Sequence, residues 1–150
     1  MTLISNCIAQ RAVLLSLFAA LTGCATTYTN VSNPLTGFAG GYYDEAGPGK
    51  LITVGFAANG YTDTETVRRY VLRRACEVVQ AAGKSEFFVF TSLEDAAARR
   101  MVGEDLGIPS LGGKPFSRIY VLPLAGPQVG SMNAAEVLDR TLVKSAKEEG

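Results

Sequence analysis

Few side chains in this sequence have a type and spacing suited to catalysis, because histidine is absent altogether. The cysteines are Cys7, Cys24 and Cys76. A chain without histidine lacks the usual general base near neutral pH and the commonest metal ligand. No CxxC, HExxH, G-x-S-x-G or complete phosphate-loop pattern occurs. The sequence therefore predicts no catalytic residues, no metal site, no cofactor and no enzymatic activity.

Cys24 ends a segment that resembles a bacterial lipobox, Leu21-Thr22-Gly23-Cys24. It follows one arginine and an apolar run over residues 12–21, which is too short to cross a bilayer core of roughly 30 Å as a helix. This arrangement is typical of a signal peptide. The lipobox resemblance implies diacylglyceryl transfer to the Cys24 sulfur, cleavage before Cys24 and acylation of the new amino terminus. The alternatives are a signal peptide cut elsewhere and a buried N-terminal helix.

The residues after Cys24 bear on location. Ala25 and Thr26 lack the aspartate that, by resemblance to Gram-negative sorting rules, retains lipoproteins in the inner membrane. We therefore expect a lipid-anchored protein of the outer membrane that faces the periplasm, rather than one of the inner membrane. The covalent lipid on Cys24 is the only attached group that we expect. Cys76 is then the sole remaining thiol and cannot form an intramolecular disulfide in the oxidising periplasm.

The composition sets the size and class of the protein. The 150 residues carry 14 basic and 14 acidic side chains, and this balance gives no electrostatic footprint for nucleic acid. A hydrophobic fraction of 47% with 19% charged residues excludes wholesale disorder. We expect a signal peptide at 1–23, a lipidated N-terminus with a flexible tether at 24–39, and a single α+β domain at 40–150.

The hydrophobic pattern predicts a small two-layer α+β sandwich with a sheet of about four strands. The order is β-β-α-β-(α)-β-α, with a long loop at 103–117. The expected strands are 40–45, 50–57, 86–91 and 118–124, and the expected helices are 63–82, 93–102 and 134–147.

The main helix, at 63–82, has signals at both ends. Thr62 and Glu65 have the spacing of a capping box, and Gly83 is a typical residue just beyond a helix end. Asn133 has N-cap spacing at the start of the last helix. The main helix carries one broad apolar stripe. Its members are Val67, Val71, Leu72, Ala75, Val78, Val79 and Ala82.

Six segments share a pattern with known sequences: Gly40-Gly41-Tyr42, Val54-Gly55-Phe56, Asn59-Gly60-Tyr61-Thr62, Leu72-Arg73-Arg74-Ala75-Cys76-Glu77, Phe87-Phe88-Val89 and Ala134–Leu138. Through them the chain resembles a family of uncharacterised proteobacterial lipoproteins over most of residues 40–140. The family has a lipobox, a Gly-Gly-Tyr strand, an Asn-Gly-Tyr-Thr turn and a Leu-Arg-Ala-Ala-Glu-like helix. The resemblance implies a location and a fold but no activity, catalytic residue or cofactor. This sequence departs from the family pattern at Cys76, where alanine is usual, and over 93–115.

Four residues are candidates for binding: Tyr61, Arg68, Arg69 and Arg73. The arginines suit anionic lipid or phosphate, and the Asn-Gly-Tyr turn displays Tyr61. The simpler interpretation is a solvated helix face with internal ion pairs, and a tyrosine that packs beside the helix start after a Gly60 of positive φ. The helical angle places Arg68 within the apolar stripe and Arg69 outside it.

These observations favour a non-enzymatic binding or structural module anchored to the membrane, with an envelope protein or peptidoglycan as partner. One alternative is an enzyme or redox-responsive protein that uses Cys76, for which arginine neighbours would lower the thiol pKa. The simpler interpretation of Cys76 is core packing. Another alternative is a self-assembling envelope module in which hairpin edges pair between subunits.

Overall fold

The computed structural model describes residues 25–30 and 40–148. Within these ranges the chain forms one six-stranded sheet and three helices, which confirms the α+β class. The strands are β1 (Gly41–Ala46), β2 (Ile52–Ala57), β3 (Glu86–Phe90), β4 (Ser110–Leu111), β5 (Lys114–Leu124) and β6 (Met132–Asn133). The helices are α2 (Thr64–Ala81), α3 (Leu93–Ala97) and α4 (Ala134–Glu148).

The main sheet is open and antiparallel, with the strand order β1-β2-β5-β3-β6, and β4 pairs with β5 as a short addition. Both β2 and β3 pair antiparallel with β5, so these two strands run parallel to each other on either side of it. The connection from β2 to β3 is α2. The long strand β5 is therefore the centre of the sheet.

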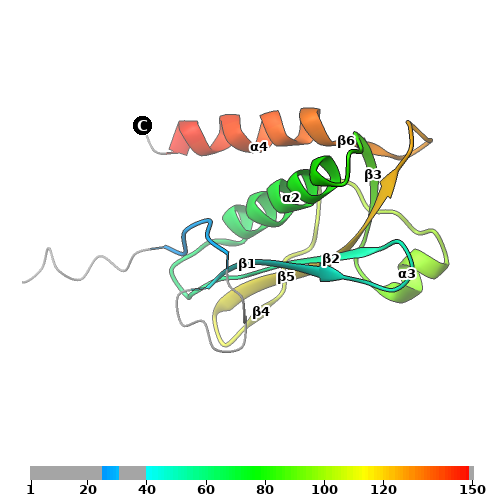
Figure 1. Ribbon diagram of the computed structural model, residues 1–150. Coiled ribbons are helices and arrows are strands. Elements are labelled where there is room, and N and C mark those ends of the chain that lie inside the picture. Colours follow the sequence, from blue (N-terminus) through cyan, green and yellow to red (C-terminus); the bar gives the residue numbers. More distant parts are fainter. Residues whose placement is uncertain (1–24, 31–39, 149–150) are drawn as a thin grey trace, which may run out of the picture.

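The core lies between the sheet and α2, and Figure 1 shows α4 beside α2 on the same side. Strands β2, β3 and β5 each contribute two alternate side chains to it. The predicted apolar stripe of α2 covers these side chains, and all of it is buried except Ala82. The core residues from the strands are Val54, Phe56, Phe87, Val89, Ile119 and Val121.

The structure has more strand than the sequence predicted, because β5 begins at Lys114 inside the expected loop. Gly112 and Gly113 have φ values of 59° and 75°. Two consecutive residues of positive φ fit a tight two-residue hairpin, which joins β4 to β5. The helix expected at 93–102 ends at Ala97, which leaves α3 with a single turn and a half.

The predicted start of the main helix is wrong by one residue. Asp63 is the N-cap of α2, and its side chain accepts a 2.8 Å hydrogen bond from the Thr66 amide. The Thr62 hydroxyl is engaged elsewhere, since it accepts a hydrogen bond from the Thr26 amide at 2.8 Å. The other two end signals are confirmed. Gly83 follows the C-cap with φ 69°, and the Asn133 side chain accepts hydrogen bonds from the Ala135 and Glu136 amides of α4.

Residues 25–30 fall in the segment expected as a tether, but they pack on the domain. Thr26 is buried, and its hydroxyl accepts a 2.8 Å hydrogen bond from the Asn59 amide. The ring of Tyr28 lies against those of Tyr42 and Tyr70, at centroid distances of 4.6 and 5.3 Å. Asn30 forms a parallel bridge with Tyr42 at the edge of β1. These contacts attach the segment to β1 and α2.

Candidate functional site

The face of the sheet that points away from α2 has an apolar floor formed by β3 and β5. Phe88 lies directly opposite Leu122 in the antiparallel register. Phe90 and Leu124 stand two residues further along their strands and share this face, because side chains alternate along a strand. The rings of Phe88 and Phe90 meet edge to face, with centroids 6.3 Å apart.

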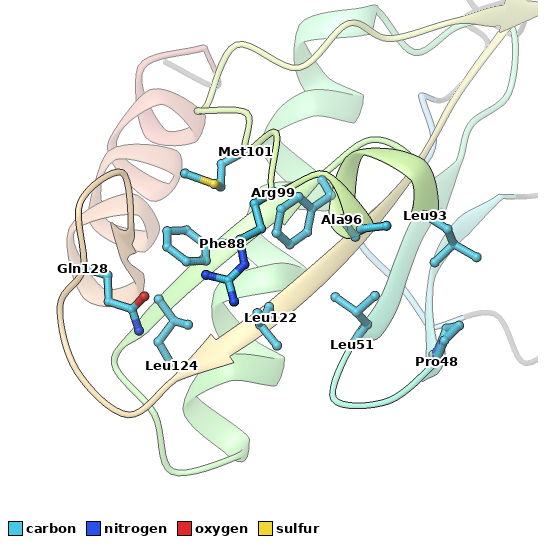
Figure 2. A pocket seen from close by; sticks show the side chains of 12 residues that line it. Pro48, Leu51, Phe88, Leu93, Ala96, Arg99, Met101, Leu122, Leu124 and Gln128 are labelled. Carbon is cyan, nitrogen blue, oxygen red and sulfur yellow. The ribbon is translucent and has the colours of Figure 1, made fainter.

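A hollow of about 550 Å³ lies above this floor, which is within the usual range for small-molecule pockets of about 300–1,000 Å³. One wall is α3 with the segment after it, including Leu93, Ala96 and Met101. Pro48 and Leu51, from the turn between β1 and β2, form another part of the rim (Figure 2). We call this hollow the α3 groove.

Hydrogen bonds hold the α3 wall in place at both ends. The Ser92 hydroxyl caps the helix by accepting a 3.0 Å hydrogen bond from the Asp95 amide, and the Thr91 hydroxyl donates to the Asp95 carboxylate at 2.6 Å. After the helix, the Val102 amide donates to the Val89 carbonyl at 2.9 Å. Local hydrogen bonds thus cap α3 at its start, and the segment after the helix is bonded to β3.

The end of α3 has an unusual backbone. Arg99 has φ 52°, the one positive value among the non-glycine residues that the structure describes. The Arg99 amide donates to the Ala96 carbonyl and the Arg100 amide donates to the Asp95 carbonyl, at 3.3 and 2.9 Å. This is the Schellman motif, and α2 ends in the same way with Gly83 at the left-handed position. A residue other than glycine costs about 1–3 kcal/mol in such a conformation.

The side chain of Arg99 lines the α3 groove. Figure 2 shows it extending from the end of α3 over the floor toward Leu122 and Leu124, with Gln128 at the same end. Its guanidinium has no hydrogen bond or ion pair with the residues that the structure describes, whereas neighbouring Arg100 pairs with Asp95 at 2.9 Å. The groove therefore combines an apolar floor with a positive charge that has no partner among the described residues, a combination that no motif in the sequence predicts.

The predicted binding residues lie elsewhere. Arg68 and Arg69 line a polar cavity of about 470 Å³ between α2 and α4. Arg68 pairs with Glu65 at 2.6 Å and donates to the Leu106 carbonyl at 3.0 Å. Arg69 is only 6% exposed and donates to the Thr66 hydroxyl at 3.0 Å. The expected placement is thus reversed, because Arg69 is the more deeply buried of the two.

Arg73 belongs to a different group, the Tyr28 cluster, which consists of Tyr28, Arg73, Arg74 and Glu77. The Arg73 guanidinium lies 4.1 Å from the centre of the Tyr28 ring, and its Nε donates to Glu77 at 2.9 Å. Arg74 bridges Glu77 and Asp44, at 3.0 and 2.7 Å. Burial opposes ionisation of Glu77, but hydrogen bonds from Tyr28 and the two arginines outweigh it and lower the pKa of this carboxyl. The arginines here bind protein groups, as the simpler interpretation predicted.

Tyr61 neither lines the cavity of Arg68 and Arg69 nor belongs to the Tyr28 cluster. Its side chain is 72% exposed and does not pack beside the start of α2, contrary to our expectation. Gly60 is also not among the described glycines of positive φ. The Asn59 side chain instead holds the turn by accepting a 3.0 Å hydrogen bond from the Tyr61 amide. The four predicted residues therefore do not converge on one site.

Cys76 is a core residue with no solvent exposure. Burial, followed by the negative charges of Glu104 and Glu77, raises the pKa of the Cys76 thiol to about 12. A thiol with so high a pKa is neutral and a poor nucleophile near neutral pH. The structure confirms the prediction that Cys76 packs in the core.

The expected signal peptide at 1–23 and the expected lipobox, Leu21 to Cys24, lie outside the described residues. Within the described part of the chain, no group of acidic or cysteine side chains is arranged to hold a metal ion. The helices described there are all too short or too polar to cross a membrane. The chain matches no protein family model, no curated protein and no solved structure.

Proposed function

We propose that this protein is a lipid-anchored binding module of the bacterial cell envelope, held in the outer membrane by acyl chains on Cys24 and facing the periplasm. The observation that carries the binding function is the α3 groove, an apolar hollow lined by Arg99, whose guanidinium has no hydrogen bond or ion pair with the described residues. The lipobox supports the anchor, because the apolar run, the small residues and the cysteine follow one another in the required order.

The chemistry of the groove supports binding rather than catalysis. The polar side chains among its lining residues are Arg99 and Gln128, and neither is a nucleophile or a general base. Cys76, the candidate of the enzyme alternative, is buried under the opposite face of the sheet with a raised pKa. A reaction at that thiol would first require the core to open.

The lining also distinguishes between classes of partner. Peptidoglycan presents hydroxyl and amide groups that each need a hydrogen-bonding partner when they lose water. The α3 groove offers two polar side chains and is otherwise apolar. It therefore favours an apolar ligand over a glycan strand.

Self-assembly through β1 has less support. Part of its outer edge is already occupied by the protein itself, since the Tyr42 amide donates to the Thr29 carbonyl at 2.8 Å and Asn30 bridges Tyr42. An edge strand covered in this way is a poor template for pairing with a second copy. We therefore prefer a binding module to an assembling one.

Metabolic labelling with palmitate tests the anchor. Wild-type protein should be labelled and should sediment with outer membranes, whereas Cys24→Ser should be neither labelled nor membrane-bound. Cys7→Ser is the matched control and should behave as wild type, because Cys7 lies in the predicted signal peptide. If wild type remains unlabelled, the anchored function is wrong.

A further inference from the structure

We infer that the α3 groove binds a non-esterified fatty acid, with the alkyl chain on the apolar floor and the carboxylate held by Arg99. This inference deepens the proposed function, because it names the ligand class of the groove. It does not require the lipid on Cys24, so the two can fail separately.

An alkyl chain suits this groove better than a peptide does. The floor belongs to β3 and β5, and their backbone groups are already paired where they run side by side. A peptide would bring an amide and a carbonyl at every residue, and each would need a partner in the groove. The side chains of the floor and walls are hydrocarbon apart from Arg99, Gln128 and the Met101 thioether. A hydrocarbon chain has no polar groups and so needs no hydrogen-bonding partner.

The position of Arg99 selects a negative head group. The guanidinium lies over the apolar end of the groove near Leu122 and Leu124, without a described carboxylate to neutralise it. A carboxylate can accept two parallel hydrogen bonds from a guanidinium, and charge-assisted bonds of this kind are among the strongest in proteins. Gln128, at the same end, offers an amide as a further donor. An alcohol or a cationic head group would lose this interaction.

The backbone of Arg99 supports the same ligand. Gly83 shows that this fold ends a helix with glycine at the equivalent left-handed position, where glycine has no steric cost. At the end of α3, the chain instead accepts the strain of an arginine. The cost has a physical explanation if the arginine side chain is needed in the groove.

Photocrosslinking with fatty probes tests the inference on the full-length protein in nanodiscs of phosphatidylcholine. The probes are diazirine-bearing palmitic acid and diazirine-bearing hexadecanol, which share a chain length and differ in the head group. Mass spectrometry then locates the labelled peptides. Arg99→Met removes the charge but keeps an unbranched side chain, and Arg100→Met makes the same change one residue later, outside the groove.

We expect palmitic acid to label peptides from β3, α3 and β5, and hexadecanol to label them about tenfold less at equal concentration. Arg99→Met should reduce palmitic acid labelling to the hexadecanol level, whereas Arg100→Met should retain wild-type labelling. Equal labelling by both probes, or unchanged labelling in Arg99→Met, would overturn the inference. So would labelling confined to other elements. Persistence of palmitate on Cys24 in the same variants would show that the anchor is intact even if the groove fails.

Discussion

The phenolic hydroxyl of Tyr28 donates a 2.6 Å hydrogen bond to the carboxylate of Glu77, 49 residues later in the chain. It joins the segment before the sheet to the C-terminal half of α2. The same carboxylate accepts hydrogen bonds from Arg73 and Arg74, so its oxygens have several donors. The Tyr28 cluster is therefore a second polar attachment of residues 25–30 to the domain, beside the hydrogen bonds of Thr26 with Thr62 and Asn59.

Tyr28→Phe should lower the free energy of unfolding by about 1–2 kcal/mol. The change removes one hydrogen bond to a charged group but retains the ring contacts with Tyr42 and Tyr70. Tyr61→Phe is the control, because it deletes the same hydroxyl from a side chain that is 72% exposed. Urea denaturation followed by circular dichroism measures both. Equal effects of the two substitutions would contradict this account of Tyr28.

The Tyr28 cluster also predicts how stability depends on pH. Burial, the hydrogen bond to Glu77 and its negative charge raise the pKa of Tyr28 above its ordinary value of 10.0. The folded state thus favours the phenol, and this stabilisation is present below about pH 10 and lost as the pH rises further. The lowered pKa of Glu77 has the opposite sign. Its contribution is present above the ordinary value of 4.5 and is lost as the pH falls through the folded value.

Thermal unfolding across pH 3–11 measures the decline of stability on both the acid and the alkaline side. The alkaline decline in stability should be shallower in Tyr28→Phe, and the acid decline should be shallower in Glu77→Gln. Tyr28→Phe should retain part of the acid decline, and Glu77→Gln should retain part of the alkaline decline. An alkaline flank that is identical in wild type and Tyr28→Phe would show that another group causes it.

Arg99→Gly should raise the free energy of unfolding by about 0.5–1 kcal/mol. The substitution removes the strain of the left-handed backbone at φ 52°. This gain exceeds the cost of the greater flexibility that glycine gives the unfolded chain. Arg100→Gly should instead destabilise the protein, because Arg100 has no positive φ and loses its pair with Asp95. Opposite signs at neighbouring positions are the expected result of denaturant titrations, and a destabilised Arg99→Gly would contradict the strain.

Cys76 should resist alkylation in the folded protein. Its thiol is inaccessible and its pKa is about 12, so iodoacetamide should react at least about a hundredfold more slowly than in guanidinium-unfolded chain. Val129→Cys is the positive control, because position 129 is 97% exposed. Mass spectrometry against time gives the rates. Rapid labelling of native Cys76 would revive the redox alternative.

Gly55→Ala should destabilise the protein by about 1–3 kcal/mol. A Cβ at Gly55 would overlap the ring of Tyr43, which crosses from the opposing residue of β1. Tyr43→Ala removes that ring, so the cost of Gly55→Ala should be smaller in this background. A double-mutant cycle measures the difference, and full additivity would show that the two residues do not interact.

Local signals predicted the parts of the fold that depend on neighbouring residues. The end of α2 at Gly83 and the cap of α4 at Asn133 each follow from one residue and its immediate backbone. The prediction of Thr62 as the N-cap is wrong because its hydroxyl accepts a hydrogen bond from the amide of a distant residue, Thr26. A capping box is recognised from two residues that lie three apart in the sequence. It therefore cannot show that the Thr62 hydroxyl has a partner 36 residues away.

Sequence patterns could not predict the candidate site. The groove depends on β5 lying between β2 and β3, an order that spacing along the chain does not determine. Arg99 carries no sequence signal, because glycine is the residue that marks a left-handed helix end. One available signal was overlooked. Gly112-Gly113 is typical of a two-residue hairpin, and it would have extended the last long strand back to Lys114.

The packed segment 25–30 determines how far the domain can stand from a membrane. Thr26 is buried in the domain and is two residues from Cys24, a separation that extended chain covers in about 7 Å. A free tether from Cys24 to Gly40 would instead reach about 55 Å. With lipid on Cys24, the domain therefore lies directly on the bilayer surface, within reach of molecules that leave the lipid headgroup layer.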